Sequence, residues 1–134
     1  MRGAMIGAAL ALSLFTLPAV AQEGAPQDVI QRQVDAFRAG DAEAAFGYAS
    51  PGIRALFGTP GNFGRMVREG YPMVWRPAEL RFLDAEERGG RRIQKVLMVD
   101  GAGVPHVLEY DMIEGEGGWL IDGVRILAAP EVGA

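Results

Sequence analysis

The residues with the clearest chemical capacity in this sequence are His106, Asp111 and Asp122, because an imidazole beside a carboxylate is a common acid–base pair. His106 is the only histidine in the chain, and strand alternation places it on one face with Tyr110 and places Asp111 on the other. Asp122 lies on a later strand and points inward unless a bulge at Gly123 resets the register. A pair of His106 with either aspartate would suit a small cofactor-free isomerase or dehydratase. A histidine in a mostly apolar strand is more often a hydrogen-bonded core residue, so we assign no catalytic residue.

Other chemistries are excluded by composition. The chain has no cysteine, which rules out disulfides, thiolate nucleophiles and cysteine-ligated metals. One histidine and scattered carboxylates match no metal-ligand spacing, so no metal and no cofactor are expected. Ser50 is the only serine beyond residue 21, and the proline that follows it favours a helix-capping role over a nucleophilic one.

The acidic net charge of the chain argues against a nucleic-acid partner. The formal net charge is −4, and the basic cluster Arg88-Gly89-Gly90-Arg91-Arg92 coincides with an expected hairpin turn. A basic turn on an acidic protein is normally a solvated loop, so no nucleic-acid binding is predicted.

The N-terminal segment has the pattern of a secretory signal. Arg2 precedes an apolar run at residues 6–17, which is shorter than the roughly 20 residues that a membrane-spanning helix needs. Pro18 breaks this run, and Ala19-Val20-Ala21 fits a signal-peptidase site. We therefore expect a Sec-type signal peptide at residues 1–21, cleaved after Ala21. The mature protein would be periplasmic or secreted from a bacterium, with no membrane anchor after cleavage.

Helical patterns occupy the first half of the remaining chain. Apolar residues at 30, 34 and 37 recur at spacings of four and three, as on one face of a helix. Ser50-Pro51 and Thr59-Pro60 each place a capping side chain before a proline, a typical helix start. The predicted helices span residues 27–38 and 42–49, then run from Pro51 to the stop at Gly58 and from Pro60 to the stop at Gly70. Residues 71–77 are expected to form an extended bridge, because residues before proline avoid the helical region.

From Glu79 onward the period changes to alternation, which indicates strands. The first strand begins at Glu79, and the next three span residues 92–99, 104–113 and 119–127. Short glycine-rich turns join them, which favours an antiparallel meander over parallel strands. The prediction is an α+β domain, with N-terminal helices packed on an antiparallel sheet of about four strands. It forms one domain at residues 22–134 with an ordered core at about residues 27–128.

Aromatic residues predict a pocket between these layers. The more apolar face of strand 104–113 carries His106 and Tyr110 toward the helices. Tyr71 and Trp75, on the proline-containing bridge, could roof a cavity or close the end of the core. These four residues and Tyr48 are the expected pocket lining.

A family resemblance adds to this interpretation. Helices are followed by a meander that ends in Gly118-Trp119-Leu120-Ile121, and matching stretches occur at residues 30–33, 37, 40–41, 45–46, 48–51, 63, 66–67, 70–71, 94–96, 109–110 and 119–124. With these stretches the chain resembles the bacterial domain-of-unknown-function family 4864 (DUF4864), within the NTF2-like, cystatin-like superfamily. The resemblance implies a curved sheet wrapped over helices as a cone with a cavity at its open end.

The same resemblance leaves the function open. Superfamily members include isomerases and dehydratases with an inward Asp or Asp-His pair, and also non-catalytic binding and dimerisation modules. The family implies no catalytic residue, and no Asp-Tyr-Asp motif of the steroid-isomerase kind is recognisable. The leading expectation is an exported, non-catalytic domain that binds a small apolar or amphipathic ligand. The alternatives are the isomerase or dehydratase and a module that forms a homodimer or binds a protein through an outer sheet face with Val107 and Ile113.

Overall fold

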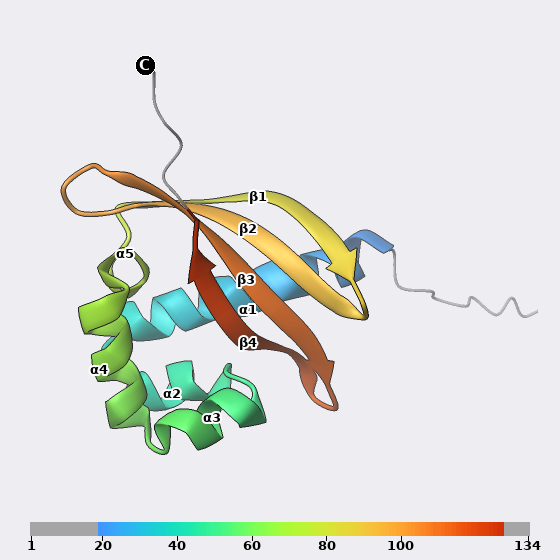
Figure 1. The fold of residues 1–134 in the computed structure, drawn as a ribbon, viewed down its shortest axis with the longest axis horizontal. Coiled ribbons are helices and arrows are strands. Elements are labelled where there is room, and N and C mark those ends of the chain that lie inside the picture. The colour runs from blue at the N-terminus through green and yellow to red at the C-terminus, as the bar shows by residue number, and fades with distance from the viewer. Residues whose placement is uncertain (1–18, 128–134) are drawn as a thin grey trace, which may run out of the picture.

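The computed structural model describes residues 19–127, with side chains from residue 25 onward. The expected signal peptide lies outside these residues except for Ala19–Ala21, and so does the tail from Ala128. Within the described residues, five helices precede four strands, and Figure 1 shows how they are arranged. The helices are α1 (Ala19–Arg38), α2 (Ala42–Gly47), α3 (Pro51–Phe57), α4 (Pro60–Gly70) and α5 (Pro72–Trp75), and the strands are β1 (Glu79–Arg88), β2 (Arg91–Val99), β3 (Pro105–Gly115) and β4 (Gly118–Ile126).

The predicted starts of α3 and α4 are confirmed by their caps. Ser50 Oγ accepts a hydrogen bond from the backbone N–H of Ile53 at 3.2 Å, and Thr59 Oγ1 accepts one from Asn62 at 3.1 Å. In both helices proline occupies the first turn, where no backbone donor is needed. Two short helices thus begin at defined residues, although neither is long enough to be stable alone in water.

The extended bridge predicted at residues 71–77 is wrong in its middle, which forms α5. Tyr71 has φ −135° and ψ 59°, and Arg76 has φ −148° and ψ 75°, so both residues before a proline avoid helical geometry as expected. Pro72 itself starts a helical turn, because its fixed φ suits the first position of a helix. The two residues that directly precede a proline therefore avoid the helix as expected. The residues between them do not precede a proline, and they form the helical turn.

The strands form one antiparallel sheet in the order β1-β2-β3-β4, as the short turns predicted. Figure 1 shows the twisted sheet lying over the helices, with α1 running beneath it and α2, α3 and α4 on the same side. The α+β prediction is confirmed. No described helix is both long enough and apolar enough to cross a membrane.

The core fills the space between α1 and the sheet. Leu108, Tyr110 and Met112 of β3 are fully buried, which confirms that this face of the strand points toward the helices. Phe37 of α1 is also fully buried, with its ring 5.9 Å from that of Phe63 in α4. The long α1 therefore supports both the sheet and the smaller helices.

Gln94 of β2 is a polar member of this core. Its side chain is fully buried at a register shift between Phe82 and Ala85 of β1. The amide donates to the carbonyl oxygens of Leu83 and Lys95, at 2.9 Å each. It thus satisfies a carbonyl that the irregular strand pairing leaves without a ladder partner.

Candidate functional site

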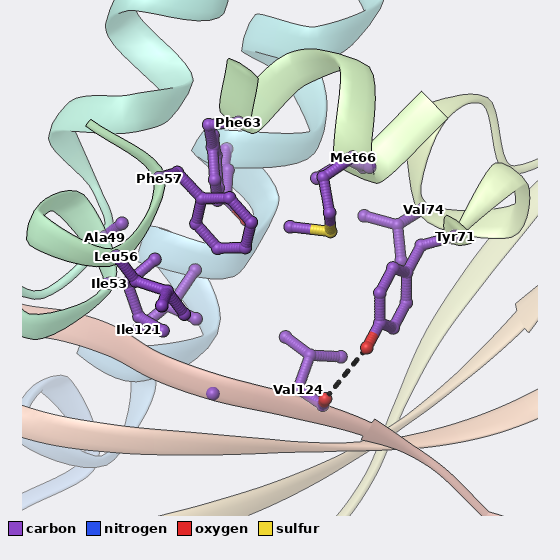
Figure 2. A pocket seen from close by; sticks show the side chains of 13 residues that line it. Ala49, Ile53, Leu56, Phe57, Phe63, Met66, Tyr71, Val74, Ile121 and Val124 are labelled. Atoms are coloured by element: carbon purple, nitrogen blue, oxygen red, sulfur yellow. Dashed lines mark hydrogen bonds between the residues drawn. The ribbon is translucent and has the colours of Figure 1, made fainter. Parts of the chain in front are cut away.

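An apolar pocket of about 220 Å³ lies between α3, α4 and β4. Figure 2 shows Phe57 and Phe63 on the helical side and Val124 on the strand below, with Met66 and Tyr71 beside them. The pocket is lined by Gln33, Ala49, Ile53, Leu56, Phe57, Phe63, Met66, Val67, Tyr71, Val74, Ile121, Gly123 and Val124. None of these side chains carries a formal charge at neutral pH.

Helical spacing positions one wall of the pocket. Phe63, Met66 and Val67 of α4 lie three and four residues apart, so they project from one face of the helix. Ile53 and Leu56 of α3 repeat the three-residue spacing. Leu56 is 72% exposed, which places it at the rim rather than in the depth of the pocket.

Two polar side chains border this apolar space. Gln33 of α1 is 3% exposed, and its Nε2 donates to the backbone oxygen of Ala45 at 3.0 Å. Tyr71, at the junction of α4 and α5, directs its hydroxyl at the backbone oxygen of Val124 with a long separation of 3.4 Å (Figure 2). The pocket is therefore apolar with a few hydrogen-bonding atoms, which is the usual composition of a small-molecule site.

Asp122 fastens α3 to the strand that forms the pocket floor. Ser50 Oγ donates to Asp122 Oδ1 at 2.7 Å, and the Ser50 backbone N–H donates to the oxygen of Ile121 at 2.8 Å. Arg91 Nη1 reaches Asp122 Oδ2 at 2.9 Å and Asp111 Oδ1 at 3.0 Å. We refer to Ser50, Asp122, Arg91 and Asp111 as the polar latch. It joins the N-terminus of α3 to β4.

A bulge explains why Asp122 is available for this latch. Asp111 pairs with Gly123 and Met112 pairs with Ile121, so Asp122 is the extra residue in β4. The sequence left two strand registers open, one regular and one reset by a bulge near Gly123. The structure adopts the register with the bulge. Asp122 therefore does not follow the inward alternation of its strand.

The polar latch predicts a loss of stability in acid. The hydrogen bond from Ser50 and then that from Arg91 hold the pKa of Asp122 below its ordinary value. Because the pKa is lower in the folded than in the unfolded protein, the contribution is present above about pH 4 and is lost as the pH falls below it. Asp122→Asn should lower the free energy of unfolding by about 1–2 kcal/mol at pH 7 and flatten its decline between pH 5 and pH 3.

Urea unfolding at several pH values measures this effect. Glu116→Gln is the matched control, since it removes an exposed carboxylate from the turn between β3 and β4. An Asp122→Asn protein with the wild-type pH slope would show that the latch carboxylate does not contribute.

The structure does not bring His106 to either of the aspartates proposed for it. His106 Nε2 lies 2.9 Å from Asp100 Oδ2, in the turn between β2 and β3. Asp100 Oδ1 also accepts from the backbone N–H groups of Ala102 and Val104, and the bond with His106 lowers the pKa of Asp100. This pair closes a turn at the end of the sheet. Asp111 and Asp122 instead pair with Arg91.

Of the five aromatic or histidine residues expected to line a pocket, Tyr71 does so. Trp75 packs on Phe37, at a ring separation of 5.4 Å, and its ring also contacts the guanidinium groups of Arg68 and Arg76. The backbone oxygen of Tyr48 accepts a hydrogen bond from the backbone N–H of Ile121 at 2.9 Å. Trp75, Tyr48 and His106 all lie outside the pocket lining.

Tyr110 is the fifth of these residues and also lies outside the pocket lining. It is fully buried, and its hydroxyl has no hydrogen-bond partner among the described residues. Burial and the nearby Tyr71 raise its pKa above the ordinary tyrosine value, so Tyr110 remains a neutral phenol. Tyr110 is paired across the sheet with Val124. The backbone oxygen of Val124 accepts the long hydrogen bond from the Tyr71 hydroxyl.

Most residues that form the pocket were not singled out from the sequence. Ile53, Phe63 and Met66 fall within the predicted helices, but nothing in the sequence showed that these helices leave a space against the sheet. Gln33 did carry a signal, because it lies three residues after Ile30 and four before Phe37 on the core-facing stripe of α1. A glutamine on such a stripe needs an internal partner or a ligand.

The described part of the chain holds no group of three or more His, Asp or Glu side chains that could bind a metal ion. The pocket lining likewise offers no imidazole, carboxylate or amine. Tyr71 is its one titratable residue.

A family model described as "Domain of unknown function (DUF4864)" matches residues 20–134. Among curated proteins, none matches the chain. Among solved structures, the chain is similar to an NTF-2 like protein of unknown function from Burkholderia xenovorans LB400. The two are 17% identical with a TM-score of 0.48, over 82% of this chain and 91% of that one.

Proposed function

The chain belongs to the DUF4864 family, and on that premise we propose that it is a non-catalytic binding domain for a small, neutral, mainly apolar molecule. The observation that carries this proposal is the uncharged pocket of about 220 Å³ between α3, α4 and β4. Burial of apolar ligand surface there would supply the affinity, at about 25 cal/mol per Å² removed from water.

The volume sets the size of the ligand. A buried apolar cavity of about 150 Å³ can hold benzene, so about 220 Å³ suits a single substituted ring or a short branched chain. It lies below the roughly 300–1,000 Å³ of pockets for drug-sized molecules. A multi-ring or long-chain ligand would have to extend past the rim at Leu56.

Catalysis is not favoured by the residues at hand. The lining lacks a carboxylate or imidazole, and His106 is held by Asp100 in a distant part of the sheet. An isomerase or dehydratase would need a base within hydrogen-bond reach of the substrate. The residues around the pocket therefore support binding over catalysis.

Pairing through the sheet has weaker support. On the outer face, Glu109 lies between Lys95 and Arg125 in cross-strand register and forms an ion pair with Arg125. This charged row separates Val107 from Ile113, the two residues on which an apolar outer patch was expected. A divided patch is less suited to a stable homodimer.

Titration of the protein with toluene tests the binding proposal. We expect saturable shifts in the NMR signals of Ile53, Met66 and Val124, and a higher melting temperature at high ligand concentration. Shifts that do not saturate, or that spread evenly over the surface, would contradict the proposal.

We propose in addition that the domain acts outside the cytoplasm. The support is the charged start, apolar run and small-residue motif of residues 1–21. Intact mass measurement of the protein from its own host tests this. A chain that begins at Gln22 is expected, and a full-length chain in the cytoplasm would contradict it.

A further inference from the structure

Gln33 is the most deeply buried polar side chain in the pocket lining, and only half of its amide group is used. It is 3% exposed, and its hydrogen bond is the one from Nε2 to the backbone oxygen of Ala45 at 3.0 Å. Among the residues that the structure describes, no donor reaches Oε1. If a ligand covers such an acceptor without donating to it, the unpaired acceptor costs about 1–3 kcal/mol.

The orientation of this amide follows from its partner. A backbone carbonyl can only accept, so the nitrogen of Gln33 must face Ala45 and the oxygen must point away from it. The fully buried side-chain atoms without partners in the described residues are Arg54 Nε and the Tyr110 hydroxyl. Gln33 Oε1 is not among them, so it is not sealed within the core. Gln33 is also one of the residues that line the pocket.

We propose that Gln33 Oε1 faces the pocket and is the acceptor that selects the ligand, so that the pocket takes a neutral, single-ring-sized molecule bearing one hydroxyl or N–H donor. This inference rests on the proposed binding function and adds its specificity. The apolar walls, such as Phe63 and Val124, contact the body of the ligand, and Gln33 Oε1 accepts a hydrogen bond from its one donor. Ionised ligands are disfavoured because the lining offers no opposite charge.

Gln33 would discriminate between molecules of equal shape. A site built to pair with a donor rejects the analogue that lacks it, because the buried acceptor is then left unpaired. Phenol and toluene differ by one hydroxyl in place of one methyl group. Anisole keeps the oxygen of phenol but has no hydrogen to donate, so it separates donation from simple polarity.

The test measures the affinity of the wild-type protein for phenol, toluene and anisole by calorimetry. Phenol is expected to bind about tenfold more tightly than toluene, although toluene is the more hydrophobic, and anisole is expected to resemble toluene. The Gln33 side-chain NH₂ signals should shift with phenol more than with toluene. Equal affinity for all three would overturn the inference and leave the binding proposal intact. If none of the three binds, the proposed function itself fails.

Gln33→Met provides the second arm, since methionine keeps the length of the side chain and removes the acceptor. Toluene should then bind at least as tightly as phenol. A preference for phenol that persists in Gln33→Met would contradict the role of Oε1. The substitution also removes the bond to Ala45, so circular dichroism must first show a folded protein. If the variant does not fold, the comparison of three ligands in the wild type decides.

Discussion

Phe37→Ala is expected to lower the free energy of unfolding by about 3–5 kcal/mol. Phe37 is fully buried on α1, and its ring lies 5.9 Å from Phe63 and 5.4 Å from Trp75. Its loss removes apolar burial and leaves a cavity where α1, α4 and α5 meet. Since domains of this size are stable by about 5–15 kcal/mol, much of the total would be lost.

Urea unfolding followed by circular dichroism measures this change. Val104→Ala is a suitable control, because Val104 is 47% exposed and lies in the turn before β3, so it should change stability by less than about 0.5 kcal/mol. Similar stability losses for the two variants would show that the aromatic cluster around Phe37 is not the centre of the core. A change in the slope of unfolding with urea would instead indicate that the unfolded state had changed.

Filling the pocket should abolish binding. Ile53 lies on α3 and borders the cavity, and tryptophan at this position would occupy much of the space that a ligand needs. The affinity of Ile53→Trp for toluene is expected to fall at least about 30-fold, which corresponds to about 2 kcal/mol. Overpacking could lower stability by about 1–3 kcal/mol, so the folded fraction must be checked first.

A second variant and a control make this result specific. Val67→Phe adds volume from α4, and because Val67 is only 5% exposed, the new ring cannot readily turn toward solvent. Val104→Trp adds the same side chain as Ile53→Trp at an exposed site outside the pocket. Both filling variants should lose toluene binding while Val104→Trp keeps it. Unchanged binding in the filling variants would place the ligand elsewhere.

Helix starts and strand order could be predicted from the sequence because they depend on local chemistry. Ser50 and Thr59 cap the helices where a capping residue precedes a proline, and the short turns between strands dictate antiparallel pairing. The face of β3 that carries Tyr110 was also predictable from alternation. These features depend on residues close together in the chain.

The pocket was harder to predict because it depends on how distant elements pack. The bulge at Asp122 moves this carboxylate out of strand alternation, and the alternation pattern alone could not choose between the two registers. Asp111 and Asp122 were considered as acid–base partners of His106, yet the nearby turn supplies Asp100 as its partner. The pocket lies between α3, α4 and β4, which are distant in the sequence, and the hydrogen bond from Ser50 to Asp122 joins the start of α3 to β4.

A crystal structure of the protein under xenon pressure would show whether the pocket between α3, α4 and β4 is an apolar binding cavity. Xenon enters apolar cavities of this kind without requiring any polar contact. We predict one strong xenon peak beside Ile53, Phe63 and Val124 in the wild type and none there in Ile53→Trp. A wild-type pocket that is filled by its own side chains, or that holds ordered water and excludes xenon, would show that it is not an apolar binding cavity.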